Sequence, residues 1–376
     1  MIISLKNPFI ITLFRSLIFY IILFSCSSTH ASTELRVAIK KNVKTLYIGS
    51  SSPANVINNQ GKQIGTLAPL NSFKIKLFNE NKISLKHWKL SYFLIEPQGK
   101  GVVSINNRWY RGKILLISQG KTIIVINLVD LNEYLYSVVG GESYPTWPKE
   151  ALKAQAIVSR TYALFKTSTS GNIHYDLDTT TKTQIYRGIE TESLATHNAV
   201  KVTSKEVLTH NGKLILSVFH SSSGGHTENV ENVWNSSLSY LQGVPDYDQL
   251  SPVFSWNQTF SSTEIGQLIN GLGTIYSLVP GKITPSGRIV TLNVLGDQGS
   301  RRVSGIELRK ILKLKSTGFG ISIDKGLFTI RGRGFGHGIG MSQWGSYYLA
   351  KQNIPYYRIL NHYYQNSDLT LLREKI

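Results

Sequence analysis

The stretch GGESYPTWPKEALKAQAIVSRTYALFK, residues 140–166, combines an acid at an unusual position with a predicted helix. Glu142 follows two glycines and precedes a Ser-Tyr-Pro turn, and the glycines are expected to give it mobility. Pro148 suits the first turn of a helix, which we expect to end near Lys166. A carboxyl group between a glycine pair and a helix is either a charge that faces solvent or a reactive group.

The predicted helix carries a polar stripe. Gln155, Ser159 and Tyr162 are spaced i, i+4 and i+7, so they share one face. The alanines and branched residues between them supply apolar positions for packing. The stripe is therefore able to reach a cleft from a packed helix.

The chain on the N-terminal side of this stretch changes from strand patterns to helix patterns. Short β-rich runs, separated by Asn, Gly, Pro and Ser, extend from Glu34 to about Gln119. Residues 121–139 then read as a buried strand followed by a short helix, whose apolar face is formed by Leu131, Tyr134, Leu135 and Val138.

These patterns predict an α+β fold with three parts. Residues 1–31 are a signal peptide, residues 32–115 a β-rich N-terminal region, and residues 116–370 a mixed α/β domain. In this domain the Ala-rich helix is expected behind an active-site cleft.

The N-terminus has the features of an export signal. Lys6 and Arg15 flank an early apolar stretch, and residues 16–24, SLIFYIILF, form an apolar region too short for a membrane span. The sequence THA at residues 29–31 resembles a cleavage site, so the mature chain is expected to begin at Ser32. We therefore predict an exported protein of the periplasm or cell envelope.

Cys26 supports a second interpretation of the same segment. The run Leu-Phe-Ser-Cys at residues 23–26 resembles a lipoprotein cleavage box, which would leave a membrane-anchored protein with a lipid on Cys26. Cys26 is the only cysteine of the chain, so disulfides and Cys-ligated metal sites are excluded if cleavage follows Ala31.

The net charge indicates an anionic partner. The chain has 376 residues and a formal charge of +19, with 41 Lys and Arg against 22 Asp and Glu. Such a balance favours nucleic acid, anionic lipid or an acidic polymer. Export argues against nucleic acid, which leaves cell-wall glycan with its carboxylates, and lipid headgroups.

Several motif families are excluded by spacing. The glycines at 332, 334, 336, 338 and 340 alternate strictly, unlike a dinucleotide-binding fingerprint. The run Gly-Lys-Thr at 120–122 lacks the upstream glycine of a phosphate-binding loop. His220 stands where a serine nucleophile elbow needs its first glycine.

Two glycine-rich blocks leave alternatives open. His337 is either a satisfied histidine of a structural glycine hairpin or part of a sugar site, which the neighbouring Gln343 and Trp344 favour. The run HSSSGGH, residues 220–226, is either a plain turn or, with scattered His and Asp ligands, part of a metal site.

Glu142 is the strongest candidate for an acid that cleaves a glycosidic bond. The proton donor must stay protonated near neutral pH, usually through partial burial, and Tyr144 and Trp147 are expected to supply apolar cover. Hydrolysis normally needs a second carboxylate, for which the candidates are Asp176, Asp178 and Glu228.

Four blocks of the chain resemble the stage II sporulation protein D family, which is related to the amidase enhancers. They are INLVDLNEYLYSVVGGESYPTWPKEALKAQAIVSRTYAL, QIYRG, FHSSSGGHTENVENVW and GRGFGHGIGMSQWGSYYLAK, and they follow one another in the expected order. The likeness extends from about Tyr110 to Tyr364.

The resemblance implies a lytic transglycosylase that cleaves the MurNAc–GlcNAc bond of denuded peptidoglycan glycan strands during cell-wall remodelling or division. It implies that Glu142, and not Glu150, is the catalytic acid and base. The substrate-binding positions that match the family's blocks are Gln155, Arg160, Tyr162, His220, Ser222, Gly225, His337, Gly338 and Gln343.

The chemistry implied by the resemblance uses one carboxyl group, no metal and no cofactor. Some family members bind zinc near the block QIYRG through cysteine and histidine, but residues 174–188 contain no cysteine here, so no zinc is predicted. Three alternatives remain: a muramidase that uses water, a noncatalytic glycan-binding enhancer of an N-acetylmuramoyl-L-alanine amidase, and a basic lipid- or nucleic-acid-binding protein.

Overall fold

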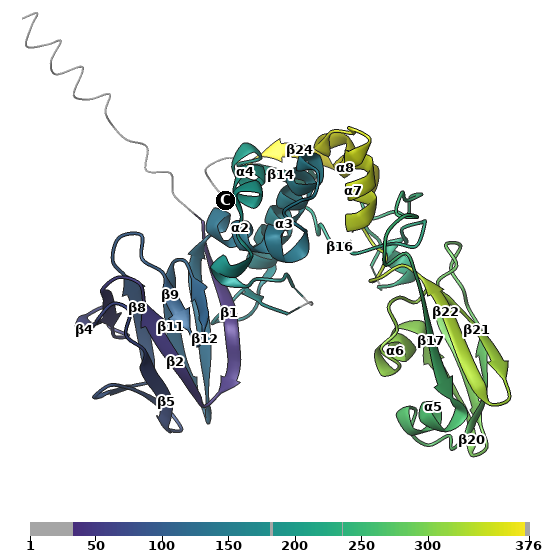
Figure 1. Cartoon of the computed structure of the whole chain (residues 1–376), viewed down its shortest axis with the longest axis horizontal. Coiled ribbons are helices and arrows are strands. Elements are labelled where there is room, and N and C mark those ends of the chain that lie inside the picture. The colour runs from purple at the N-terminus through teal and green to yellow at the C-terminus, as the bar shows by residue number, and fades with distance from the viewer. Residues whose placement is uncertain (1–32, 181–182, 235, 373–376) are drawn as a thin grey trace, which may run out of the picture. The chain divides into compact units, whose positions relative to one another are not determined.

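The computed structural model describes residues 33–180, 183–234 and 236–372. The predicted α+β fold is confirmed, since the region that begins at Glu34 is built of strands and the α-helices, mixed with further strands, come after Asp130 (Figure 1). The predicted signal peptide and Cys26 lie outside the described residues. The predicted boundary between residues 115 and 116 stays a prediction.

The N-terminal part is built from two sheets whose inward side chains belong to one buried cluster. In spatial order the seven-stranded sheet contains β13 (Leu177–Asp178), β1 (Glu34–Val43), β12 (Thr122–Asp130), β11 (Lys113–Gln119), β8 (Tyr92–Pro97), β3 (Ala54–Ile57) and β4 (Gln63–Leu67). The six-stranded sheet contains β10 (Arg108–Tyr110), β9 (Val103–Ile105), β2 (Thr45–Ser50), β5 (Phe73–Asn79), β6 (Lys82–Leu85) and β7 (Trp88–Leu90).

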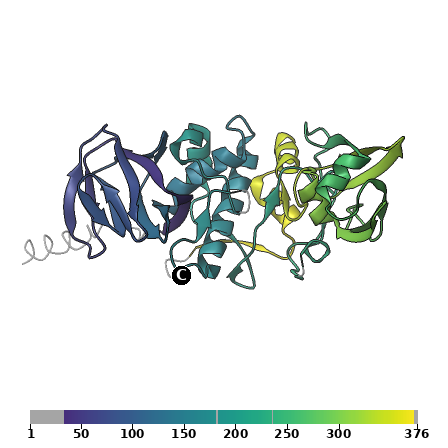
Figure 2. The same ribbon diagram turned by 90° about the horizontal axis from the view of Figure 1, so that it is seen from below.

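Helices follow the last long strand of this region. The α-helices are α2 (Leu131–Glu142), α3 (Lys149–Thr169), α4 (Leu194–Val202), α5 (Ser262–Leu268), α6 (Gly305–Ile311), α7 (Gln343–Lys351) and α8 (Tyr356–Tyr363), and the 3₁₀ helices are η1 (Gly188–Thr191) and η2 (Val230–Asn232). Helix α3 packs against α2, α4, α7 and α8, and α7 lies beside α8 in both views (Figure 1, Figure 2).

Four smaller sheets complete the described chain. They are β15 (Lys213–Leu214) with β14 (Glu206–His210) and β24 (Asp368–Leu371); the parallel pair β16 (Phe219–His220) and β23 (Met341–Ser342); β17 (Ser255–Ser261) with β22 (Leu327–Arg333) and β21 (Phe319–Asp324); and β18 (Ile275–Pro280) with β19 (Thr291–Gly296) and β20 (Gly299–Ser304). The last two sheets and helices α5 and α6 enclose a second buried cluster of their own.

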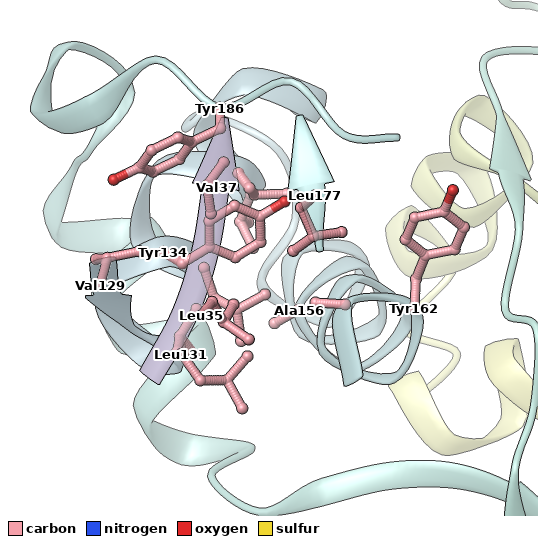
Figure 3. Packing of buried hydrophobic residues seen from close by; sticks show 14 of the residues in the cluster. Leu35, Val37, Val129, Leu131, Tyr134, Ala156, Tyr162, Leu177 and Tyr186 are labelled. Atoms are coloured by element: carbon pink, nitrogen blue, oxygen red, sulfur yellow. The ribbon is translucent and has the colours of Figure 1, made fainter. Parts of the chain in front are cut away.

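The apolar face predicted for the first helix is buried. Tyr134 and Leu135 are fully buried in α2, and Tyr134 lies among Leu35, Val37 and Leu177 (Figure 3). The side chain of Asp130 caps this helix by accepting hydrogen bonds from the first backbone amides, which satisfies donors that have no partner within the helix. Strand β12 and helix α2 are therefore joined without a loop.

The glycine pair before Glu142 allows close packing and does not give mobility, which corrects the expectation from the sequence. Gly140 and Gly141 belong to the last turn of α2. A Cβ atom at Gly140 would overlap the carbonyl oxygen of Thr191, and one at Gly141 would lie 2.6 Å from the carbonyl oxygen of Ile185. The chain from Ile185 to Thr191 is thus able to lie directly against the end of the helix that carries Glu142.

We predict that Gly140→Ala destabilises the protein by about 1–3 kcal/mol, since the new methyl group has no room. Helix propensity alone predicts the opposite sign, because alanine is favoured over glycine by about 1 kcal/mol within a helix. The measurement is urea-induced unfolding followed by circular dichroism.

The matched control is Gly171→Ala, because no atom lies within 4 Å of a Cβ at Gly171. Its effect should stay within about 0.5 kcal/mol. A Gly140→Ala protein as stable as the parent, or more stable, would contradict the packing described here.

Candidate active site

Glu142 is the final residue of α2 and is partly buried beneath the chain that follows. Its Oε1 atom accepts a hydrogen bond of 2.7 Å from the backbone N–H of Ile185. The side-chain amide of Gln343, the first residue of α7, donates to the backbone carbonyl of Glu142 at 3.0 Å. Segments that are 43 and 201 residues away in sequence therefore meet at this acid.

Burial raises the pKa of Glu142 from its usual value to about 7. The backbone N–H of Ile185 and, to a smaller extent, the side chain of Gln343 near the carboxyl group lower this pKa because they stabilise the ionised form, but they do not cancel the cost of removing the charge from water. A carboxylic acid with a pKa near neutrality is able both to donate and to accept a proton at physiological pH.

Two glutamines connect the polar stripe of α3 to this acid. The amide of Gln343 also lies 3.4 Å from Oε1 of Gln155, and Gln155 donates to the hydroxyl of Ser159 at 3.0 Å. Gln155 and Ser159 are buried, so the predicted stripe lies inside the protein, where α3 meets α7.

Tyr162 completes the surroundings of Glu142 on α3. Burial raises its pKa to about 12, and the negative charges of Asp178 and Glu142 add to this effect. Burial also holds the pKa of Tyr134 well above its usual value, with Glu142 as the next contribution. Both phenols therefore stay protonated near neutral pH, and Tyr162 and Tyr134 project from α3 and α2 respectively (Figure 3).

The two aromatic residues expected to cover Glu142 differ in burial. Trp147 is buried and packs against Trp344 and Tyr347, with ring centroids 5.1 and 5.2 Å away. Tyr144 is 63% exposed, which corrects the expectation that it covers the acid. The turn between α2 and α3 directs Tyr144 toward solvent.

Arg160 lies apart from this group, although its position on α3 was predicted to bind substrate. Its guanidinium is buried and donates to the backbone carbonyls of Val200 and Glu206 at 3.1 Å. Burial lowers its pKa to about 10. This arrangement joins α3 to the end of α4 and to β14, which is a structural contribution.

The two glycine-rich blocks meet through the parallel pair β16 and β23. His220 pairs with Ser342, the residue before Gln343, so the histidine block is next to the glutamine that contacts Glu142. Ser342 caps α7 by accepting a hydrogen bond from the backbone N–H of Gly345, as the sequence predicts.

His220 and His337 lie together with ring centroids 5.4 Å apart. Burial lowers the pKa of His220 well below its usual value, and it lowers the pKa of His337 to about 3, with the charge of Arg288 contributing in both cases. Both rings are therefore neutral at pH 7. Nδ1 of His220 lies 3.0 Å from the carbonyl oxygen of Ile339, while its buried Nε2 has no hydrogen-bond partner among the described residues.

Ser222 and Gly225 belong to a buried turn that is held by one carboxylate. Asp248 accepts hydrogen bonds from the hydroxyl of Ser222 and from the backbone N–H groups of Gly224 and Gly225. Ser222 is fully buried, so its hydroxyl stabilises the turn and is not presented as a nucleophile.

Gly338 provides space for a buried arginine. A Cβ atom at Gly338 would overlap the guanidinium of Arg288, which donates to the carbonyl of Ser223 at 2.7 Å.

The sequence did not predict Arg288, because it lies in a segment without a recognisable pattern. It also missed the backbone N–H of Ile185, for which the block QIYRG was the only signal.

The three candidates for a second acid are all engaged elsewhere. Asp176 forms an ion pair with Arg36 at 2.6 Å, and Asp178 forms one with Lys41 at 2.8 Å. Glu228 accepts hydrogen bonds from one backbone amide and from two side chains. Glu142 is thus the candidate acid whose carboxyl group is kept protonated.

Glu150 contrasts with Glu142. Partial burial alone would raise its pKa, but Lys153 at 2.7 Å and the backbone N–H of Tyr356 at 2.9 Å dominate and hold it below the usual value. Glu150 therefore remains ionised and stabilises the junction of α3 with α8.

Among residues 33–180, 183–234 and 236–372, no group of three or more His, Cys, Asp or Glu side chains lies close enough to hold a metal ion. No helix in this part of the chain has the length and hydrophobicity of a membrane span. The absence of metal and cofactor stays a prediction. Two surface hollows, one lined by Tyr136 and His197 and one by Asn257 and Arg331, do not include Glu142.

Comparison with known proteins adds independent evidence. The family model described as stage II sporulation protein (SpoIID) matches residues 119–210, and one described as a domain of unknown function (DUF8618) matches residues 228–340. The first range contains Glu142, Ile185 and the whole of α3.

Individual relatives match over larger parts of the chain. The stage II sporulation protein D of Bacillus subtilis is 31% identical over 261 residues, which cover 64% of this chain and 75% of that protein. An uncharacterized protein of Brachyspira hyodysenteriae is 33% identical over 298 residues, 77% of this chain and 80% of that protein. The amidase enhancer of Bacillus subtilis is 29% identical over 388 residues, 86% of this chain and 54% of that protein.

The fold and the site define an α+β protein in which a partly buried acid, Glu142, ends a helix. The chain belongs to the stage II sporulation protein D family, as the resemblance of its four blocks predicts.

The raised pKa of Glu142 predicts a pH-dependent difference in stability between the parent protein and Glu142→Gln. The folded state holds its proton up to about pH 7, while the unfolded chain loses it near 4.5. The unfolded state thus binds fewer protons, so the contribution of Glu142 is complete below pH 4.5 and is lost as the pH rises toward 7. Between pH 4.5 and pH 7 the free energy of unfolding of the parent protein should therefore fall by about 3 kcal/mol relative to that of Glu142→Gln.

Urea unfolding of both proteins between pH 4 and pH 8 measures this difference. The control is Glu150→Gln, for which the sign is reversed, because a lowered pKa gives stability that is lost as the pH falls. A difference between parent and Glu142→Gln that does not change with pH would contradict the burial of a protonated acid.

Proposed function

We propose that this protein is an exported lytic transglycosylase that cleaves the MurNAc–GlcNAc bond of denuded peptidoglycan strands. Membership of a family that includes proteins named stage II sporulation protein D and an amidase enhancer supports a function in the cell wall. The observation that carries the specific proposal is the enclosure of Glu142, whose Oε1 atom accepts a hydrogen bond from the backbone N–H of Ile185 and whose backbone carbonyl accepts one from Gln343. Burial in this position raises the pKa of Glu142 to about 7.

In the proposed reaction Glu142 serves as acid and then as base. Its proton passes to the oxygen that bridges MurNAc and GlcNAc, and the bond from that oxygen to C1 of MurNAc breaks. The 6-hydroxyl of the same MurNAc attacks C1 and gives its proton to the carboxylate. The product is a 1,6-anhydro sugar, no water is consumed, and Glu142 ends in its starting state.

The neighbouring groups suit the binding of a polar, uncharged sugar. Gln155 and Gln343 supply amides, and Tyr162 supplies a phenol that stays protonated. His220 and His337 are neutral, so they contribute hydrogen bonds without a positive charge that would favour ionisation of Glu142.

The engagement of the other acids favours attack by the 6-hydroxyl. A hydrolase normally uses a second carboxylate to activate water or to form a covalent intermediate. Asp176 and Asp178 are held in ion pairs, and Glu228 is held by hydrogen bonds. A muramidase reaction, in which water attacks C1, remains the alternative outcome at the same site.

A second candidate function is that of a noncatalytic glycan-binding enhancer of an N-acetylmuramoyl-L-alanine amidase. It is favoured by the match to a protein named amidase enhancer, of which this chain covers 54%. An amidase is the expected partner in either case, because it would produce the denuded strands that the proposed enzyme uses.

Export to the periplasm or cell envelope is part of the proposal. It is supported by the apolar run at residues 16–24 and by the small-residue site at 29–31. Lipid attachment at Cys26 is the alternative to a soluble mature protein.

We predict that Glu142→Gln abolishes the release of anhydro-ended fragments from denuded glycan, with a loss of at least about a hundredfold in rate. Parent activity should fall as the pH rises above 7, because the protonated acid is depleted. The measurement is mass spectrometry of the products, in which anhydro ends differ from reducing ends by one water.

Glu150→Gln is the matched control and should keep the parent activity. Reducing ends in place of anhydro ends would indicate a muramidase. Undiminished cleavage by Glu142→Gln would remove Glu142 from the mechanism, and stimulation of an amidase that survives the substitution would favour the enhancer.

A further inference from the structure

A flat polar face on strands β17 and β22 has no part in the site described above. Side chains alternate along a strand, and in β22 Phe328 and Ile330 point into the second buried cluster. Arg331 and Arg333 point the other way and are exposed. Two residues of a strand span about 7 Å, so the two guanidinium groups form a row.

The facing strand completes this surface with neutral polar groups. Ser255 pairs with Arg333, and Asn257 pairs with Arg331. Together with the backbone of Trp256 and Gly332 these residues line an open hollow of about 530 Å³ (strands in Figure 1). We name the four side chains Ser255, Asn257, Arg331 and Arg333 the arginine face.

The positive charge of this face is not neutralised by nearby acids. Neither Arg331 nor Arg333 forms an ion pair with any acid among the described residues. The guanidinium of Arg333 lies 5.9 Å from the ring of Phe254. The single acid in the three strands of this sheet, Asp324, pairs with Leu327 at the opposite end of β22.

The segment around the arginine face also carries an excess of positive charge. Between residues 255 and 333 the chain has eleven lysines and arginines and four acids. An uncompensated row of guanidinium groups is suited to carboxylates, because the planar fork donates two parallel hydrogen bonds. The hydroxyl of Ser255 and the amide of Asn257 are suited to sugar hydroxyl and acetamido groups.

The arginine face is continuous with the glycine-rich turn of the candidate site. A Cβ atom at Gly224 would lie 2.8 Å from Cβ of Arg333, so this turn packs directly on the strand. The backbone N–H of Gly334, next to Arg333, donates to the carbonyl of Phe254 at 2.7 Å. Ser222 exchanges two backbone hydrogen bonds with Phe335, two residues beyond Arg333, so the turn that holds Ser222 and Gly225 is bonded to the end of the face.

We propose that the arginine face binds the carboxylates of the glycan strand, the lactyl groups that become free when stem peptides are removed. This inference rests on the proposed substrate and names the part of the chain that recognises its charge. It gives a ligand to the region matched by the domain of unknown function. The face selects denuded strands over strands whose carboxylates are blocked by peptides.

The test measures binding separately from cleavage. The full mature chain carrying Glu142→Gln, alone or with Arg331→Gln and Arg333→Gln, is titrated with soluble denuded glycan and with chitin hexasaccharide, which has the same type of backbone without carboxylates. We expect the two substitutions to raise the Kd for denuded glycan about tenfold and to leave the Kd for the chitin oligosaccharide unchanged.

The matched control replaces Lys74 and Lys76 with glutamine. These lysines are exposed at the same i, i+2 spacing on β5, in another sheet, so the variant loses the same charge elsewhere. Its Kd for denuded glycan should change less than twofold. The single variant Arg331→Gln, which removes a side chain at the surface only, should raise the Kd about threefold.

The inference would be overturned by an unchanged Kd for denuded glycan in the double arginine variant, or by an equal loss of affinity in the lysine control. It would also be overturned by an equal loss of affinity for the chitin oligosaccharide. A fourth contrary result is arginine-dependent binding of polyglycerol phosphate that is tighter than binding of the glycan. The proposed function fails independently, if Glu142→Gln still cleaves. The binding comparison keeps its meaning in that case, since cleavage is not its readout.

Discussion

The hydrogen bond from the backbone N–H of Ile185 to Oε1 of Glu142 is the contact on which the candidate site depends. It exists because Gly140 and Gly141 have no side chains, so the chain from Ile185 to Thr191 lies against the last turn of α2. The same approach covers Glu142 and separates it from water. Packing, acidity and the proposed chemistry therefore have one structural cause.

Two opposing effects determine the state of each acid in this protein, and their balance differs from site to site. At Glu142 burial exceeds the hydrogen bonds to the ionised form, and the pKa rises to about 7. At Asp178 burial also raises the pKa, but hydrogen bonds from Lys41, Thr180 and Thr183 exceed it and hold the pKa well below the usual value. Glu142 is more deeply buried than Asp178 and has no cationic partner among the groups that shift its pKa, so the effect of burial prevails there.

The sequence predicted the helices that flank Glu142 well because their signals are local. Spacing and residue type predict the buried face of Tyr134 and Leu135, the approximate limits of α3 and the helix cap at Ser342. The structure agrees with each of these predictions. The contact between Gln155 and Gln343, 188 residues apart, was not predicted, because the family resemblance names both residues as substrate-binding positions without saying that they meet. The role of Gly140 and Gly141 could not be predicted, since it depends on which distant segment packs against them. Arg160 was predicted to bind substrate only through the family resemblance. Its hydrogen bonds to the carbonyls of Glu206 and Val200 could not be predicted, because these residues lie 46 and 40 positions away in sequence.

The most direct test of the account is the titration of Glu142 itself. With ¹³C-labelled glutamate, the carboxyl resonance of Glu142 is assigned by its loss in Glu142→Gln and followed by NMR between pH 4 and pH 9. The carboxyl group of Glu142 is expected to titrate with a midpoint near pH 7. A midpoint near 4.5, the ordinary value of a glutamate, would mean that Glu142 is ionised at neutral pH and would contradict its assignment as the proton donor.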